Sequence, residues 1–253
     1  KGVRQYFLLR ANNIHISFKD NMIIFMAGMS LVFTPGGIGE IIKSKFFQDN
    51  HNVTIKDTMP IVIMEKFHEF LAYIIIIGIA IIFYNFLISQ IALILGVSIT
   101  TIIFINLRYE KTMKILRRYL MKIKFIRKKI ENEEGFRKTF FKLTSLKNMF
   151  GGWVITTTSI FFELLAIYTI FISFDFYLNF LLVSQVTLTS LLLGYISFLP
   201  NGVGVTDGSF IGLLTQNGIT ISMATALVLT IRFIGLWFKT GIGFLALKKL
   251  SKI

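Results

Sequence analysis

Residues 70–107 read FLAYIIIIGIAIIFYNFLISQIALILGVSITTIIFINL and contain no Asp, Glu, Lys or Arg. A helix that spans a membrane needs about 20 apolar residues, so this stretch is long enough to cross a bilayer twice. Two more uncharged stretches cover residues 176–206 and 208–231. They lack the short alternating segments of a membrane β-barrel, and a helix is the other structure that satisfies its own backbone in lipid. The sequence therefore predicts an all-α polytopic membrane protein.

The composition of the whole chain agrees with this class. Of its 253 residues, 54% are hydrophobic and 16% are charged, whereas a soluble domain has about a quarter of its residues charged. The chain has no cysteine, which excludes disulfide frameworks, thiolate catalysis and cysteine-ligated metal.

The positive charge is concentrated in one loop. The formal net charge is +14, and residues 108–148 contribute +10 of it, from 14 Lys or Arg and 4 Asp or Glu. A basic loop between membrane spans indicates the cytosolic side, and we expect it to attract anionic headgroups rather than nucleic acid. The turns near residues 85, 175 and 217 hold no Lys or Arg, so we expect them outside. The prediction is a multi-pass protein of the cytoplasmic (cell) membrane, with loop 108–148 and the C-terminus cytosolic.

The apolar stretches divide a single membrane domain, residues 1–253, into two kinds of element. Stretches of full length predict spans over 58–84, 86–107, 149–172 and 221–247. Shorter apolar pieces interrupted by Pro and Gly predict two re-entrant helical hairpins, over 21–48 and 180–217. Apolar residues at helical spacing predict an interfacial amphipathic helix over 115–130, with a solvated loop as the alternative. The chain opens at Lys1, and a fragment that lacks its first spans stays an alternative.

The two predicted hairpins share a motif. Residues 35–39 read PGGIG and residues 200–204 read PNGVG, each followed by an acid, Glu40 or Asp207. Each is also followed, about 30 residues later, by a charge within a span, Glu65 or Arg232. Repeats of opposite orientation, with broken helices where they meet, are a transporter architecture. The fold class that we predict is therefore an inverted-repeat helical bundle with two re-entrant hairpins.

Ionisable residues within spans are costly and indicate functional sites. Arg232 falls near the middle of the last span, and Lys239, seven residues on, is expected on the same helix face. Glu65, His68 and Glu69 share a face of another span, and two carboxylates so placed repel unless a cation lies close or one of them is protonated. One interpretation is an intramembrane charge pair that joins Glu65 or Glu69 to Arg232.

The other interpretation is a site for a lipid phosphate. Free N–H groups at helix N-termini favour anions, and both glycine-rich breaks would supply them beside the cations. The candidate lipid- or phosphate-binding residues are Gly36, Gly37, Gly39, Glu40, Gly202, Gly204, Asp207, Arg232 and Lys239.

Several motifs of soluble enzymes fail on inspection. The stretch GGIGEIIKS has Ile42 where a P-loop needs glycine, and His15, His51 and His68 lack metal-ligand spacing. The pair Glu65 and Glu69 is too closely spaced on one helix to flank a glycosidic bond. We predict no catalytic residue, no cofactor and no bound metal.

The ordered motifs resemble a known family. TPGGIGEIIKSKFF at 34–47, EKFHE at 65–69 and FLPNGVGVTDGSF at 198–210 are similar to the membrane region of lysylphosphatidylglycerol synthases and of the flippase-like proteins related to them. The family's E-R-x-x-D element corresponds to Glu65 and Glu69, with Lys66 where Arg is usual. Its second break commonly reads P-G-G-x-G-x-x-E, from which Asn201 and Asp207 depart conservatively.

The resemblance implies translocation of an anionic phospholipid or a polyprenyl-phosphate-linked lipid across the cytoplasmic membrane. Family members that attach lysine to lipid do so in a separate soluble domain, which this sequence does not contain, so a transporter is expected rather than an enzyme. The alternative is a membrane subunit or partner of a lipid aminoacyl- or glycosyltransferase, and a non-transporting scaffold is a third. The implied partners are membrane lipids and, in the alternative, such a lipid-modifying enzyme.

Overall fold

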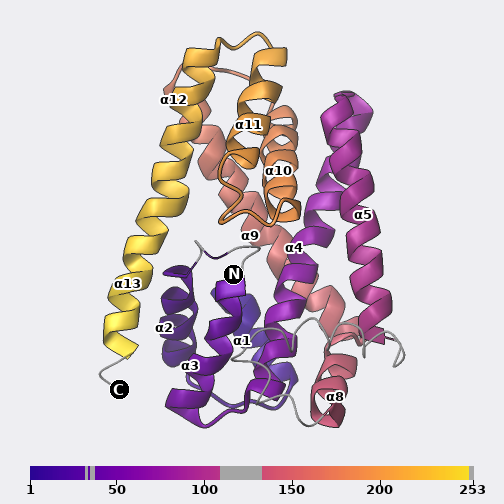
Figure 1. Ribbon diagram of the computed structural model, residues 1–253, viewed down its shortest axis with the longest axis vertical. Coiled ribbons are helices and arrows are strands. Elements are labelled where there is room, and N and C mark those ends of the chain that lie inside the picture. The colour runs from indigo at the N-terminus through magenta and orange to yellow at the C-terminus, as the bar shows by residue number, and fades with distance from the viewer. Residues whose placement is uncertain (32–33, 35–37, 109–132, 251–253) are drawn as a thin grey trace.

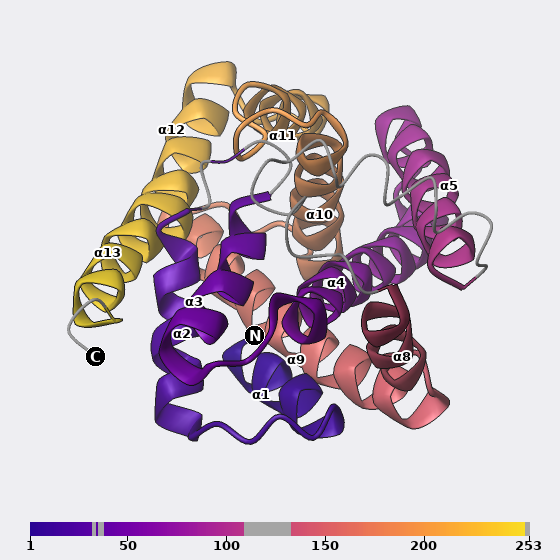
Figure 2. The ribbon, with the colours of Figure 1, turned by 60° about the horizontal axis from the view of Figure 1, so that its bottom comes forward.

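The computed structural model describes residues 1–31, 34, 38–108 and 133–250, and within this part of the chain it is built of helices. Figure 1 labels them, and Figure 2 turns the bottom of the molecule forward. In chain order they are α1 (Gly2–Ala11), α2 (Phe18–Met29), η1 (Ile38–Ile41), α3 (Ile42–His51), α4 (Ile55–Phe83), α5 (Leu87–Arg108), α8 (Glu133–Leu143), α9 (Leu146–Ser173), α10 (Phe180–Ile196), α11 (Val205–Gln216), α12 (Ile221–Arg232), η2 (Phe233–Phe238) and α13 (Lys239–Leu250).

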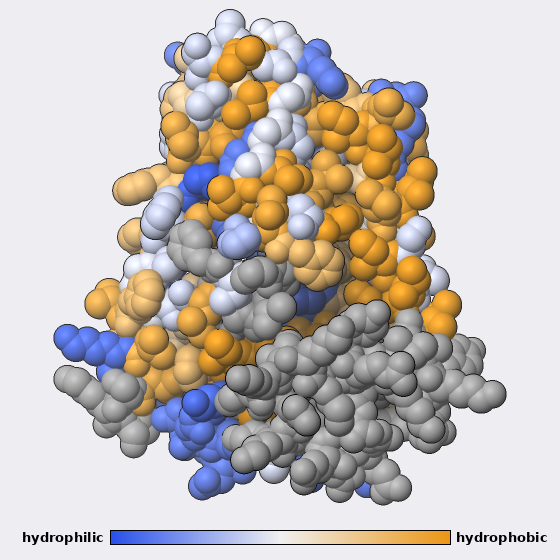
Figure 3. All heavy atoms as spheres, in the orientation of Figure 1, coloured by the Kyte–Doolittle hydropathy of each residue, from blue (hydrophilic) through white to orange (hydrophobic). Residues whose placement is uncertain are grey.

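Four helices are long and apolar enough to cross a membrane. They are Ile55–Phe83, Leu87–Ile105, Leu146–Ser173 and the continuous segment Ile221–Leu250, and they lie over the stretches expected as spans. Large apolar side chains on their outer faces are exposed, among them Ile82, Leu95 and Phe244, as expected where helices face lipid rather than water. Hydrophobic residues also dominate much of the surface seen in Figure 3. The expectation of an all-α polytopic membrane protein is confirmed.

Both predicted hairpins are pairs of short helices. α2 ends at Met29 before η1 and α3 begin, and α10 ends at Ile196 before α11 begins at Val205. Figure 1 shows the α10–α11 pair in the upper half with its break pointing down, and α2 and α3 in the lower half. Whether the breaks turn back within a bilayer stays a prediction. The amphipathic helix expected over 115–130 lies outside the described residues.

The second break has a local cause. Asn201, Gly202 and Gly204 adopt positive φ angles of 50°, 64° and 84°, which end a right-handed helix. A Cβ on Gly202 would also clash with the backbone of Gly194 on α10. Glycine is therefore required at residue 202 for both its conformation and its space.

The last span contains a change of helix type. η2 is a π-helix, with i→i+5 hydrogen bonds, and it separates Arg232 at the end of α12 from Lys239 at the start of α13. The sequence prediction placed these two cations on one face by assuming an unbroken α-helix. That prediction is wrong, because the wider π turn changes the rotation between them, and their side chains reach acids on different helices, Asp207 on α11 and Glu163 on α9.

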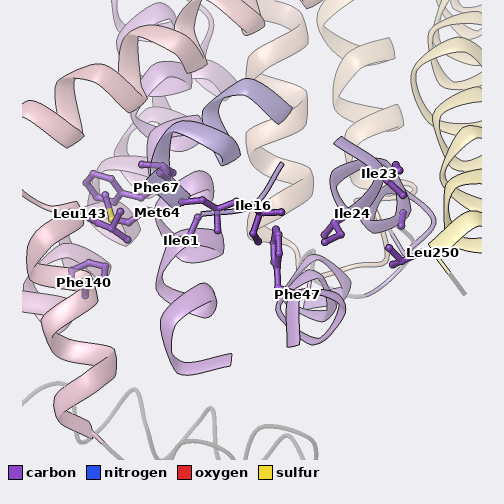
Figure 4. Packing of buried hydrophobic residues seen from close by; sticks show 13 residues of the cluster. Ile16, Ile23, Ile24, Phe47, Ile61, Met64, Phe67, Phe140, Leu143 and Leu250 are labelled. Atoms are coloured by element: carbon purple, nitrogen blue, oxygen red, sulfur yellow. The ribbon is translucent and has the colours of Figure 1, made fainter. Parts of the chain in front are cut away.

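The apolar core lies in three clusters. The lower cluster, shown in Figure 4, joins α1, α2, α3, α4, α8 and α13 through residues such as Leu8, Phe47 and Met64. A middle cluster around Ala72 joins α4, α5, α9 and α10, and an upper cluster packs α9 to α12 together. On α4, residues 65–69 fall between Met64 of the lower cluster and Ala72 of the middle one. The charged residues of α4 are thus held between two apolar layers.

Candidate functional site

The site is built on the inward face of α4. Glu65, His68 and Glu69 lie at positions i, i+3 and i+4, so one face carries all three, and each is at most 3% exposed. Burying two neighbouring carboxylates requires cations close by. The structure supplies these cations from α1, from α3 and from α4 itself.

Six side chains form a closed ring of alternating charge, which we call the charge ring. Its members are Arg4, Glu65, Lys43, Glu40, Lys66 and Glu69, in that order around the ring. Arg4 Nη2 lies 3.1 Å from Glu69 Oε1 and 3.8 Å from Glu65 Oε1. Lys43 Nζ lies 2.6 Å from Glu65 and 3.5 Å from Glu40. Lys66 Nζ closes the ring, 2.6 Å from Glu40 and 3.0 Å from Glu69.

Packing of the surrounding helices brings the ring together. Leu8 and Leu9 of α1 join the same cluster as Met64 of α4, which places Arg4, one turn before Leu8, against the charged face of α4. Figures 1 and 2 both place the N-terminus in the middle of the molecule. Glu40 and Lys43 lie three residues apart just after the first break and approach α4 from the other side.

The ring has a buried side and an accessible side. The side chains of Arg4, Lys43, Glu65 and Glu69 are 0–4% exposed, whereas those of Glu40 and Lys66 are each 21% exposed. On the face shown in Figure 3, strongly hydrophilic atoms lie in a hollow at mid-height within a largely hydrophobic surface. A ligand would therefore meet Glu40 and Lys66 first.

Glu40 is held in its charged form. Burial alone would raise the pKa of its carboxyl, but the ammonium groups of Lys66 and Lys43 outweigh that effect and keep the pKa below its usual value. Lys66 thus faces a carboxylate on each side.

Lys66 also links the two halves of the molecule. Its Nζ atom contacts Glu40 beside the first break and lies 5.0 Å from the ring centroid of Tyr195. Tyr195 belongs to the last turn of α10, directly before the second break. The residues next to both breaks therefore meet at one cation.

An arm of three further residues extends the ring toward the last span. Lys1 Nζ lies 3.9 Å from Glu69 and 2.8 Å from Glu163 on α9, and Lys239 Nζ of α13 lies 2.7 Å from Glu163. The exposed fractions of these side chains are 28% for Lys1, 30% for Glu163 and 44% for Lys239. Ring and arm together form a continuous series of charged groups from α3 to α13.

Arg232 does not join this series. Its Nε donates to Asp207 Oδ1 at 2.6 Å, and its Nη1 donates to the carbonyl of Asn201 at 3.3 Å. The other carboxylate oxygen of Asp207 accepts from the backbone N–H of Gly204. The predicted pairing of Arg232 with Glu65 or Glu69 is therefore wrong: an acid within the same half of the chain lies closer, and the carboxylates of α4 are paired by Arg4, Lys43 and Lys66.

The predicted phosphate-site residues thus fall into two groups. Glu40 and Lys239 belong to the charge ring and its arm, and Gly39 lies in η1 one residue before Glu40. Gly202, Gly204, Asp207 and Arg232 surround the second break, where Asp207 already caps the N-terminus of α11. Gly36 and Gly37 lie outside the described residues.

Sequence reasoning missed five residues of the ring and its arm as site residues: Lys1, Arg4, Lys43, Lys66 and Glu163. Arg4 and Lys43 lie in helices of ten residues, too short to read as spans, so the rule that a charge within a span is functional did not apply to them. The spacing of Glu40 and Lys43 was a usable signal, because residues three apart face each other on a helix. Among the described residues, no group of His, Asp or Glu has the arrangement of a metal site.

Comparison with known proteins points to a single family. Residues 1–243 match the family described as the lysylphosphatidylglycerol synthase TM region. No solved structure matches the chain at a significant level.

Two curated archaeal relatives carry the same descriptive name. The UPF0104 membrane protein of Methanothermobacter thermautotrophicus is 29% identical over 165 residues, which cover 59% of this chain and 48% of that protein. The chain thus matches about half the length of that relative. The UPF0104 membrane protein of Pyrococcus horikoshii is 26% identical over an alignment of 280 positions, which covers all of this chain and 83% of the relative.

Proposed function

This chain belongs to the family of the lysylphosphatidylglycerol synthase TM region, and from that premise we propose that it moves an anionic lipid between the leaflets of the cytoplasmic membrane. The lipid is an anionic phospholipid or a polyprenyl-phosphate-linked lipid. Its phosphate is held at the accessible side of the charge ring and its arm, while its acyl or prenyl chains stay in the surrounding bilayer.

The observation that carries the proposal is the position of Lys66. A headgroup that crosses about 30 Å of hydrocarbon needs polar groups partway, and the charge ring lies between two apolar layers of the bundle. Lys66 is the member of the ring that contacts residues next to both breaks, Glu40 and Tyr195. Its ammonium group is partly accessible, so a phosphate can reach it.

The inverted repeat predicted from the sequence agrees with this proposal. In transporters of this architecture, the substrate binds where the discontinuous helices of the two halves meet, and rocking of the halves exposes the site to each side in turn. Here Lys239 and Lys1 continue the positive groups from Lys66 toward the last span. A phosphate group would find cations along this path.

The test is lipid movement by the purified protein in liposomes. Fluorescent phosphatidylglycerol and a fluorescent polyprenyl phosphate are compared as probes, and accessibility to a membrane-impermeant quencher reports the leaflet. We expect Lys66→Met to slow movement by at least about tenfold, because a hydrogen bond to a charged group contributes about 1.5–3 kcal/mol. Lys66→Arg keeps the charge and should retain movement. Lys147→Met, at an exposed lysine of α9, is the matched control.

A wild-type protein that moves neither probe would contradict the proposal. In that case the role of membrane partner to a lipid aminoacyl- or glycosyltransferase takes its place. If Lys66→Met and Lys147→Met slowed lipid movement equally, the charge ring would have no specific role in that movement.

A further inference from the structure

His68 is a buried titratable group that the proposed function leaves unused. Its side chain is 0% exposed, and neither Nδ1 nor Nε2 has a hydrogen-bond partner. The imidazole of His68 packs directly against Gly152 of α9, where an added Cβ would clash with the imidazole. A neutral imidazole has one donor and one acceptor, and a buried group left unpaired costs about 1–3 kcal/mol. The site is thus unfavourable for histidine in this state.

A second unpaired atom lies on the same helix face. Glu65 precedes His68 by three residues, and its Oε1 atom also has no hydrogen-bond partner. Arg4 Nη2 lies 3.8 Å from that oxygen, too far for a hydrogen bond. Side chains three residues apart on a helix are neighbours, so a protonated imidazole would have an acceptor in Glu65.

The charged groups that face His68 come from α1 and α4. Arg4 from α1 repels a protonated imidazole, whereas Glu65 and Glu69 on the same face of α4 attract it. α9 contributes Gly152 and Thr156 there, which carry no charge. Arg4 is in place beside the imidazole, hydrogen-bonded to Glu69 and Thr156.

An anionic headgroup changes this balance. The charge ring holds three cations and three carboxylates and is formally neutral, and the arm, with Lys1 and Lys239 against Glu163, carries +1. A bound phosphate adds negative charge to the site, which favours the protonated form of a nearby imidazole and offsets the repulsion between Arg4 and the imidazolium. The anion and the proton therefore stabilise each other in the site.

We propose that His68 takes up a proton when an anionic headgroup binds at the charge ring, so that lipid and proton cross the membrane together. The inference rests on the proposed function and adds its coupling ion. The imidazole accepts the proton from water on the side where the lipid enters, and returns it to water on the side where the headgroup leaves.

This coupling is reciprocal by thermodynamic necessity. If one proton binds with each headgroup, the apparent Kd for the lipid rises about tenfold for each unit of pH above the range in which His68 is protonated. A pH gradient imposed across the membrane, acidic on the side where the lipid enters, should likewise accelerate lipid movement between the leaflets. Collapse of this pH gradient with an ionophore should remove the acceleration.

The deciding experiment measures proton uptake by the wild-type protein. The protein in detergent is titrated with short-chain phosphatidylglycerol by calorimetry, in two buffers that differ in ionisation enthalpy. At a pH where His68 of the lipid-free protein is deprotonated, we expect the protein to take up about one proton for each lipid that binds. Lipid binding without proton uptake would overturn this inference and leave the proposed function standing, whereas a protein that binds neither phosphatidylglycerol nor a short-chain polyprenyl phosphate at any pH would overturn both.

Variants assign the proton to its residue. His68→Gln should bind lipid with a Kd that no longer depends on pH, and His51→Gln, at a partly exposed histidine at the end of α3, should behave as wild type. If His68→Gln fails to fold, the wild-type calorimetry still decides whether a proton is taken up. Proton uptake that persists in a folded His68→Gln protein would overturn the assignment.

Discussion

Arg4 illustrates how one residue holds the site together. Its guanidinium is 1% exposed and is hydrogen-bonded to Glu69 and to Thr156, so it connects α1 to α4 and α9. Without it, Glu69 would retain Lys66 and Lys1, but Glu65 would have only Lys43. A buried ion pair adds little stability over apolar packing, whereas removal of one partner leaves the other as an unpaired buried charge, which destabilises the protein.

We predict that Arg4→Met destabilises the protein by about 3–5 kcal/mol, the usual effect of leaving one buried charge unpaired. The measurement is resistance to unfolding in mixed detergent. The double variant Arg4→Met/Glu69→Gln should lose less than the two single losses together, because it removes both partners. Arg10→Met, at an exposed arginine of the same helix, is the control. A loss in Arg10→Met as large as that in Arg4→Met would show that the buried contacts do not matter.

Part of the site could be predicted from single residues. The expected repulsion between Glu65 and Glu69 pointed to a nearby cation, and the structure places several cations beside them. The identity of that cation could not be predicted, because Arg4 reaches α4 through the packing of Leu8 and Leu9 in the lower cluster. Arg232 was the cation visible within a span, yet its partner, Asp207, stood in the motif next to the second break.

At the scale of elements, the π-helix in the last span sets where Arg232 and Lys239 point. π segments occur as local insertions in α-helices, frequently at functional sites. Here η2 allows Arg232 to hold the second break while Lys239 extends to Glu163. A regular α-helix over the same residues would rotate Lys239 with respect to Arg232.

We predict that deletion of Gly235, within η2, converts the π-helix to an α-helix and separates Lys239 from Glu163. Residues 236–250 would rotate by about one residue, or 100°. Cysteines that replace Lys239 and Glu163 should be joined by a bifunctional thiol reagent in the chain without the deletion, and not after it. Unchanged cross-linking would mean that the helix absorbs the deletion elsewhere. Deletion of Gly218, in the turn before α12, is a control outside the helix.

The elements also show the limits of sequence reasoning. Long, largely apolar stretches located all four long helices, because burial in lipid requires a composition that few other structures share. The π-helix could not be predicted. Breaks in a helix are signalled in the sequence by Pro-Gly motifs or by charges, whereas FIGLWF at 233–238 has the pattern of an ordinary apolar α-helix.

At the scale of the whole molecule, we predict that the basic loop and the C-terminus face the cytosol. The excess of Lys and Arg in residues 108–148 indicates this orientation. Cysteines that replace Lys124 and Lys249 should react with an impermeant reagent only after the cell is opened, and a cysteine in place of Asp175 should react in intact cells. Labelling at residue 124 in intact cells would reverse the orientation of the molecule.

The helix α13 packs against α2, the first helix of the first predicted hairpin. Gly243 of α13 packs on α2 so closely that a Cβ there would clash with the backbone of Met29 and Ser30, and Leu250 completes the apolar cluster around Ile23 and Ile24. During synthesis the N-terminal part leaves the ribosome long before α13 does. α2 must therefore stay in the membrane without its partner until α13 has been synthesised, a period in which insertase chaperones would shield it and quality-control proteases would recognise chains that stop before α13.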